Sequence, residues 1–182
     1  MILMGITGPI GHGKSTFADA LKEFEPASCR LESSTVISEI ANAMHNTLRD
    51  IPKADDIKAI NDWLRTLPVI LLEQLQTHAT FEQIEIKQEM IDQHPVEFQK
   101  LELHLENLTR DPKLAKQPID NDNKESYRPF LQWLGGYLVQ HVDAQIWYKE
   151  IIRRAYKAEA EGCKLCIVGG VRFPQDAALL RQ

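Results

Sequence analysis

Short apolar runs near both ends of the chain enclose a long region of helical periodicity. Met1–Thr7 is a brief apolar run that predicts a buried strand, and Thr16–Glu23 has the pattern of a helix that follows it. Ser28–Leu31 is a weaker candidate for a second strand, and Lys164–Val168 is a candidate for a buried strand near the end. Strands that alternate with helices in this way predict an α/β protein with a short parallel sheet.

The region from about residue 50 to 125 differs from its flanks. It contains no glycine, and its apolar residues recur at the spacing of a buried helix face. The pattern predicts helices that begin at Asp55, Pro68 and Pro95, followed by an exposed and mobile loop over Asp111–Asn123. We expect this region to be a helical insertion within a single domain that covers residues 1–182.

The last third of the chain predicts helices and one strand. A helix over Tyr127–His141 is interrupted by the glycines at 135 and 136, and Asp143 can cap the next helix, which Gly162 ends. A final helix begins at Gln175, after the buried strand. Parallel sheets of this class normally continue for one or two more strands. The chain is therefore either a minimal version of the fold or, as we favour, a C-terminally truncated fragment of a longer product.

A phosphate-binding pattern follows the first predicted strand. Gly8–Ser15 reads G-P-I-G-H-G-K-S, which matches G-x-x-x-x-G-K-[ST] between a strand and a helix. Its glycines allow backbone N–H groups to point at phosphate oxygens, Lys14 can bridge the β- and γ-phosphates of ATP, and Ser15 can ligate Mg²⁺. We call this segment the glycine loop. The residues expected to bind the nucleotide are Gly8, Gly11, His12, Gly13, Lys14, Ser15 and Thr16, with the His12 side chain exposed and not catalytic.

Composition restricts the class of protein. The chain has 182 residues, of which 43% are hydrophobic and 26% charged, as in soluble globular proteins. A formal net charge of -5 argues against a broad nucleic-acid-binding surface. No stretch approaches the roughly 18 apolar residues of a membrane span, and the N-terminus does not resemble a signal peptide. We expect a cytoplasmic protein with no nucleic-acid or membrane partner, and the oligomeric state stays open.

The cysteines do not form a recognisable disulfide or zinc pattern. Cys163 and Cys166 form a C-x-x-C pair in the late strand, and no second pair accompanies them. We expect both to be buried structural thiols.

Two further segments narrow the class of nucleotide-binding protein. One reads R-P-F-L-Q-W-L-G-G from Arg128 and is followed by V-D-A-Q-I-W, and the other reads I-V-G-G-V-R-F-P-Q-D-A from Ile167. Together with the glycine loop, their order and approximate spacing resemble the phage-type deoxynucleoside monophosphate kinases. That family has an arginine before L-Q-x-x-G, then D-x-x-x-W, and then an apolar strand that ends in a D-V-R-F-P-x-E type sequence. The resemblance covers the whole chain and is least specific between about residues 50 and 125.

The resemblance implies a kinase with a three-layer P-loop fold that transfers the γ-phosphate of ATP to a nucleoside or deoxynucleoside monophosphate, with Mg²⁺. Lys14, Arg128 and Arg172 would be catalytic. Arg128 would hold the acceptor phosphate, and Gln132, one helical turn later, would reach the acceptor base or phosphate. Arg172 lies just past the carboxyl end of the late strand, where α/β sheets bind ligands.

One position departs from the family pattern. The family aspartate that organises Mg²⁺ is replaced by Gly170. Glu32, after the second predicted strand, is then the carboxylate expected near the acceptor or a metal-bound water. Two alternatives stay open: another small-molecule P-loop kinase, such as one that acts on dephospho-coenzyme A, and a nucleotide-binding module with little catalytic activity.

Overall fold

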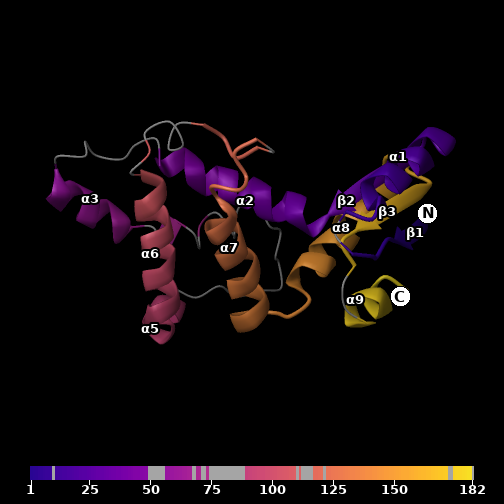
Figure 1. Cartoon of the computed structure of the whole chain (residues 1–182). Coiled ribbons are helices and arrows are strands. Elements are labelled where there is room, and N and C mark those ends of the chain that lie inside the picture. Colours follow the sequence, from indigo (N-terminus) through magenta and orange to yellow (C-terminus); the bar gives the residue numbers. More distant parts are fainter. Residues whose placement is uncertain are drawn as a thin grey trace. The chain divides into compact units, whose positions relative to one another are not determined.

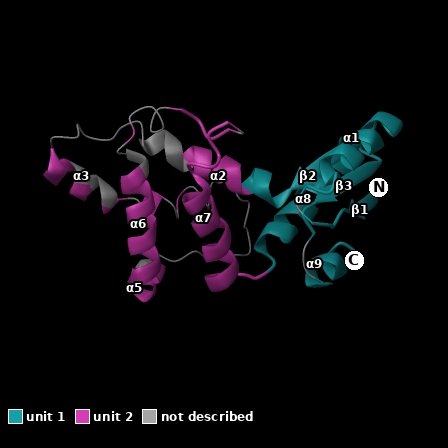
Figure 2. Ribbon diagram, in the orientation of Figure 1, with its two compact units in different colours: residues 1–36, 145–182 teal, residues 37–144 magenta. Residues whose placement is uncertain are grey.

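The chain forms two compact units (Figure 2). The structure, a computed structural model, describes residues 1–9, 11–48, 56–66, 69, 70, 73, 89–109, 111, 117–120, 122–171 and 174–181. The first unit contains residues 1–36 and 145–182, and the second contains residues 37–144. The expected helical insertion, at about 50–125, lies within the second unit.

A three-stranded parallel sheet organises the first unit (Figure 1). Strands β1 (Ile2–Gly5) and β2 (Ser28–Glu32) both pair with β3 (Leu165–Gly169), so that the strand order is β1-β3-β2. This arrangement confirms the predicted α/β class with a short parallel sheet. Because the strands are parallel, the ends of β1 and β2 lie on either side of the end of β3.

Helices cover both faces of the sheet. The side chains of β3 alternate, so that Leu165 and Ile167 pack against α1 (Lys14–Phe24), while Cys166 and Val168 pack against α8 (Ile146–Ala160). Helix α9 (Pro174–Leu179) adds apolar contacts to the α8 face. Burial on both faces explains why β3 is a continuous apolar run.

The second unit is helical in its described part. Its elements are α2 (Ser33–Leu48), which belongs to this unit from Ile37 onward, α3 (Ile57–Leu64), α5 (Glu89–Gln93), α6 (Pro95–Thr109) and α7 (Arg128–His141). Helices α6 and α7 pack through aromatic side chains. Trp133 and Tyr137 are stacked with ring centroids 4.9 Å apart, and Phe98 meets both rings edge-on. The Trp133 indole donates a hydrogen bond to the Glu97 carbonyl at 2.8 Å.

Two predictions about helix boundaries in the last third of the chain were wrong. Helix α7 runs without interruption through Gly135 and Gly136. Gly135 serves packing there, because a Cβ at this position would lie 3.1 Å from Cδ1 of Ile37 in α2. The N-cap of α8 is Gln145, two residues after Asp143, because a turn at residues 144 and 145 precedes the helix.

The loop before α7 was predicted to be exposed, and this is wrong for Ile119, which is buried. The Asn42 side chain binds both backbone groups of Ile119: its Oδ1 accepts from the N–H at 2.7 Å, and its Nδ2 donates to the carbonyl at 3.1 Å. The partner lies 77 residues away along the chain, so the local polar pattern carries no sign of it. The predicted helix starts at Asp55 and Pro68 lie outside the described residues, and the Asp56 carboxylate accepts a hydrogen bond from the Ala59 N–H.

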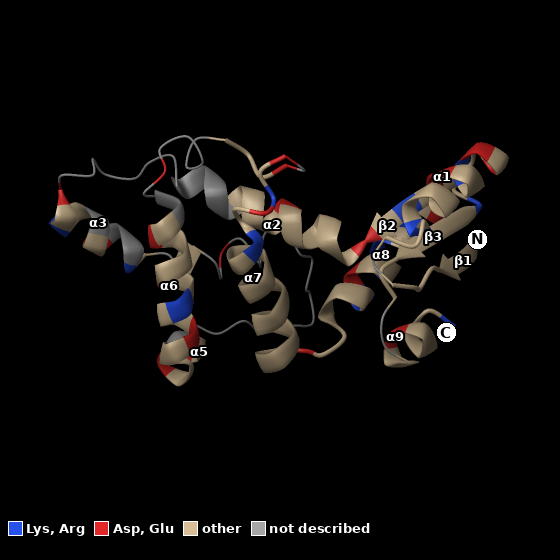
Figure 3. Ribbon diagram, viewed as in Figure 1, with Lys and Arg blue, Asp and Glu red and all other residues tan. Residues whose placement is uncertain are grey.

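Basic and acidic residues both occur along the ribbon of each unit (Figure 3). Among the described helices, none has both the length and the apolar character that crossing a bilayer requires.

Candidate functional site

The glycine loop connects β1 to α1 at the carboxyl edge of the sheet. Gly8, Gly11 and Gly13 have φ values of 149°, 80° and 72°, in the region where side chains are strained and glycine is favoured. Gly13 is the N-cap of α1, so the helix begins at Lys14 and directs its positive N-terminal end toward the loop. Ile10 lies outside the described residues. The loop therefore has the glycine-dependent backbone that its sequence predicts.

Lys14 folds back over the start of the loop. Its Nζ donates hydrogen bonds to the carbonyl oxygens of Gly8, at 2.7 Å, and Pro9, at 2.5 Å. The ammonium group is thereby held where the backbone curls. His12 and Thr16 are exposed, and for His12 this confirms the predicted exposure.

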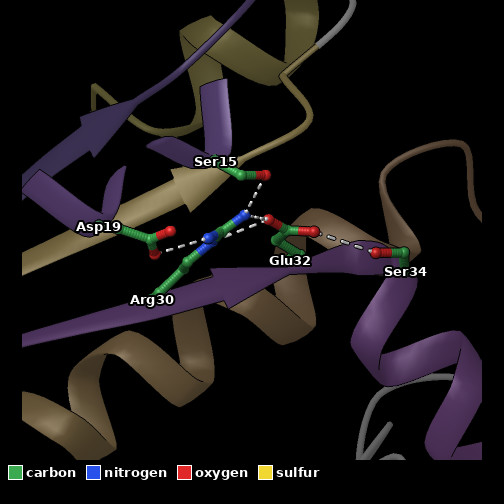
Figure 4. Close-up of polar contacts among 5 residues, drawn as sticks. All are labelled: Ser15, Asp19, Arg30, Glu32 and Ser34. Carbon is green, nitrogen blue, oxygen red and sulfur yellow. Dashed lines mark hydrogen bonds and ion pairs between the residues drawn. The ribbon is translucent and has the colours of Figure 1, made fainter. Parts of the chain in front are cut away.

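Three oxygen-bearing side chains converge on Arg30 (Figure 4). Its Nη2 donates a hydrogen bond to Ser15 Oγ at 3.0 Å, and its Nε donates to Glu32 Oε1 at 2.9 Å. Its Nη1 lies 3.3 Å from Asp19 Oδ1. Ser15 and Asp19 belong to α1, whereas Arg30 and Glu32 are two residues apart on β2 and so share a face. The guanidinium therefore links the glycine loop to the end of β2.

The Glu32 carboxylate is held on both sides. Its Oε1 accepts from Arg30, and its Oε2 accepts from the Ser34 hydroxyl at 3.2 Å. Glu32 is paired in register with Gly169 of β3. A Cβ at Gly169 would lie 2.7 Å from Glu32 Oε1, so the carboxylate occupies space that a side chain on β3 would need. Glu32 is the last residue of β2, where we expected it to follow the strand.

Gly170, just after β3, has a φ of 76° and no neighbouring atom within 4 Å of a Cβ built there. Its carbonyl oxygen accepts a hydrogen bond from the Tyr148 hydroxyl at 2.8 Å. In the part of the chain that the structure describes, no group of three or more His, Cys, Asp or Glu side chains could hold a metal ion. The oxygens of Ser15, Asp19 and Glu32 fit Mg²⁺, which prefers oxygen ligands and retains several waters.

Two residues expected to bind the acceptor belong to the second unit. Arg128 is exposed at the start of α7, and its Nε donates to Glu125 Oε2 at 2.7 Å, while its Nη2 pairs with Glu125 Oε1. The hydrogen bond raises the pKa of Arg128 and lowers that of Glu125. Gln132 is exposed one turn later on the same helix. Arg172 lies outside the described residues.

A buried carboxylate lies beside the site, on α8. Glu150 accepts hydrogen bonds from Arg153 at 2.7 and 2.8 Å and from Arg154 at 2.9 Å. Burial raises the pKa of Glu150, but the bonds and charges of the two arginines outweigh it and hold the pKa below its usual value. Arg154, Arg30 and Glu32 also line a small cavity of about 30 Å³ at the end of β2.

The three cysteines meet in the first unit. Cys29 of β2 is paired in register with Cys166 of β3, and Cys163 Sγ donates a hydrogen bond to the Leu165 carbonyl at 3.3 Å. Burial is the main cause that raises the pKa of Cys29, and the neighbouring thiols of Cys163 and Cys166 raise it further. Cys166 is buried as expected, whereas Cys163 is only half-buried.

Sequence analysis identified Ser15 and Glu32 but missed the residue that connects them. Arg30 was not a candidate because its role depends on the packing of α1 beside β2. Strand β2 is one residue longer than predicted, so that Arg30 and Glu32 are two positions apart within it and point to the same side. The predicted strand ended at Leu31 and gave no such signal.

Comparison with known proteins assigns no family to the chain. No protein-family model matches it, and no curated protein matches it. Its function is therefore inferred from the glycine loop, from the convergence of Ser15 and Glu32 on Arg30, and from the two sequence segments that begin at Arg128 and Ile167.

Proposed function

We propose that the chain is an ATP-dependent phosphotransferase of the P-loop type that phosphorylates a nucleoside or deoxynucleoside monophosphate in the cytoplasm, with Mg²⁺. The observation that carries the proposal is the position of Ser15 and Glu32. A hydroxyl from the glycine loop and a carboxylate from the end of β2 both contact one guanidinium, at the carboxyl edge of a parallel sheet. Ligands of α/β proteins bind at this edge.

The donor half of the reaction belongs to the first unit. Phosphoryl transfer depends on positioning and on cations around the moving group rather than on covalent chemistry. The Lys14 ammonium exchanges its carbonyl partners, Gly8 and Pro9, for phosphate oxygens of ATP. Mg²⁺ neutralises charge on the transferred group when bound, and Ser15 and Glu32 are the residues that would hold it. The Glu32 carboxylate orients a water or the acceptor.

The acceptor half is assigned to the second unit. The Arg128 guanidinium offers a planar fork that matches two phosphate oxygens, and Gln132 offers an amide within one helical turn. Both are exposed and therefore accessible to a nucleotide. Arg172 is proposed to approach the transferred phosphate from the end of β3. The resemblance to phage-type deoxynucleoside monophosphate kinases supports these assignments.

Thermal unfolding with and without ATP and Mg²⁺ tests the donor site. A ligand at 100 times its dissociation constant stabilises a protein by about 2.7 kcal/mol. We expect the parent chain to gain this stabilisation and Lys14→Ala to lose most of it, because the ammonium is the main fixed cation of the loop. Lys22→Ala, at the other end of α1, is the matched control and keeps the gain. Equal stabilisation of the Lys14→Ala variant and the parent would contradict nucleotide binding by this loop.

Turnover separates the kinase from its alternatives. A panel of nucleoside and deoxynucleoside monophosphates, with dephospho-coenzyme A included, is incubated with ATP and Mg²⁺, and ADP formation is measured. We expect ADP only with a monophosphate. Turnover with dephospho-coenzyme A alone identifies another small-molecule kinase. Binding of ATP without turnover on any acceptor identifies a nucleotide-binding module.

A further inference from the structure

A cation of the chain itself, Arg30, contacts Ser15 in this site. Arg30 contacts Ser15 Oγ at 3.0 Å, Glu32 Oε1 at 2.5 Å and Asp19 Oδ1 at 3.3 Å (Figure 4). These are a hydroxyl and two carboxylate oxygens, which is the chemistry that attracts a hydrated divalent cation. The guanidinium therefore occupies the place where the proposed function requires the positive charge of Mg²⁺.

We infer that Arg30 is an internal competitor of the divalent cation: it binds Ser15 and Glu32 in the free protein, and Mg²⁺ that arrives with ATP must displace it. This inference rests on the proposed function and adds a regulatory contact to the same site. It makes Arg30 a determinant of whether the loop prefers ATP with or without metal.

Electrostatics requires the two cations to exclude each other. Two like charges that share the same oxygen ligands repel each other strongly near a protein surface, and a divalent ion doubles the repulsion of a monovalent one. Arg30 can stay in place beside metal-free ATP, because added phosphate charge attracts it. If Mg²⁺ is bound to Ser15 and Glu32, the guanidinium can no longer form hydrogen bonds with either oxygen.

The geometry also allows Arg30 to leave. Its side chain is 30% exposed, and none of its three partners lies in the apolar core. Glu32 keeps its hydrogen bond from Ser34 when Arg30 moves, so the carboxylate stays at the end of β2. Release of Arg30 therefore costs the contacts of one guanidinium and leaves the sheet unchanged.

The test compares ATP binding with and without metal. Dissociation constants of ATP are measured by calorimetry in excess Mg²⁺ and in excess EDTA for the parent chain and for Arg30→Met, which keeps an unbranched apolar stem and removes the charged guanidinium. Loss of a positive charge weakens ATP binding in both conditions. The ratio of the dissociation constant in EDTA to that in Mg²⁺ therefore reports only the competition between Arg30 and the metal ion. If Arg30 fills the site nine-tenths of the time, its removal shifts the ratio about tenfold in favour of metal-bound ATP.

Two variants control this measurement. Arg65→Met removes the same charge from an exposed ion pair in the second unit and leaves the ratio unchanged. Arg30→Lys keeps the charge but loses the planar fork, so it shifts the ratio in the same direction by a smaller factor. Because Arg30→Lys preserves a cation between Asp19 and Glu32, it also answers the question if Arg30→Met does not fold.

A second readout does not need ATP. Mn²⁺ is added to the free protein as a paramagnetic probe, and the relaxation of water protons is measured. Removal of Arg30, by the Met or the Lys substitution, strengthens Mn²⁺ binding, and Glu32→Gln in the same background abolishes the gain.

The outcomes separate the inference from the proposed function. If ATP binds neither the parent nor the variants, the proposed function fails, and the Mn²⁺ result alone decides the inference. If ATP binds and either the ratio or Mn²⁺ binding is unchanged by loss of Arg30, the inference is overturned. A large loss of ATP affinity in both conditions, with a constant ratio, assigns Arg30 to phosphate binding instead.

Discussion

Gly169 has no side chain and so leaves room for the Glu32 carboxylate. A Cβ at this position would lie 2.7 Å from Oε1 and 2.9 Å from Cγ of Glu32, closer than carbon atoms normally approach their neighbours. We predict that Gly169→Ala displaces the Glu32 carboxylate from Arg30 and Ser34. Because the Glu32 side chain is flexible and partly exposed, the cost in folding stability is at the lower end of the range for overpacking, about 1 kcal/mol. We expect the affinity for ATP in the presence of Mg²⁺ to fall by about tenfold. A tenfold change in the dissociation constant corresponds to a loss of about 1.4 kcal/mol in binding free energy.

The neighbouring glycine provides the control. Gly170 has open space around a Cβ but a left-handed backbone, so Gly170→Ala costs roughly 1 kcal/mol of stability through strain alone. Chemical denaturation and calorimetry with ATP and Mg²⁺ measure the two effects separately. We expect both variants to lose stability but only Gly169→Ala to lose affinity. Comparable loss of affinity in both would mean that Glu32 does not hold the metal.

The residues of the site differ in how far the sequence reveals them. Lys14 and Ser15 are set by a spacing within eight consecutive positions, so the loop could be predicted with its strand and helix. Arg30 required the packing of α1 beside β2, which depends on long-range contacts that no local pattern encodes. The predicted strand ended at Leu31, so the sequence did not place Arg30 and Glu32 on one face of a strand, and it did not predict that side chains of α1 contact Arg30.

Helix α7 illustrates how packing overrides a local preference. Two adjacent glycines predict a break, because glycine destabilises a helix interior by about 1 kcal/mol relative to alanine. The helix continues because Gly135 allows Ile37 of α2 to approach, whereas Gly136 is exposed and has no atom within 4 Å of a Cβ. The three strands and helices α1, α6 and α9 were predicted to within a few residues, since their signals are apolar periodicity, prolines and capping residues, whereas α5 was not predicted.

The glycine pair gives a matched test of this packing. We predict that Gly136→Leu stabilises the protein by up to about 1 kcal/mol, because leucine favours the helix and no neighbour obstructs it. Gly135→Leu destabilises it by about 1–3 kcal/mol, because the added side chain collides with Ile37. Urea denaturation followed by circular dichroism measures both. Equal effects at the two positions would show that α2 does not pack on this face of α7.

The proposed donor residues and the proposed acceptor residues belong to different units. The donor residues Lys14 and Ser15 belong to residues 1–36 and 145–182, and the acceptor candidates Arg128 and Gln132 belong to residues 37–144. The sequence predicted a helical insertion over about residues 50–125, whereas the second unit covers residues 37–144. The predicted range is shorter because only the glycine-free part of that unit has a distinctive composition.

Arg128 has a partner that an acceptor phosphate would have to replace. Glu125 holds its guanidinium through two contacts, and the hydrogen bond from Arg128 keeps the pKa of Glu125 below its usual value. The carboxylate is therefore charged at neutral pH, and the pair loses its attraction only when acid protonates Glu125. We predict that Glu125→Gln lowers the KM for the monophosphate by no more than about fivefold, because a fully exposed ion pair is weak.

Steady-state kinetics with ATP and the monophosphate varied in turn measures this effect. The KM for ATP stays constant in Glu125→Gln, since the donor residues lie in the other unit. Arg128→Lys acts in the opposite direction on the acceptor, because lysine lacks the fork that matches a phosphate. Asp62→Asn, which breaks the exposed pair with Arg65, is the control and changes neither constant. If Glu125→Gln instead raises the KM for the monophosphate as Arg128→Lys does, the ion pair positions Arg128 for the acceptor and does not compete with it.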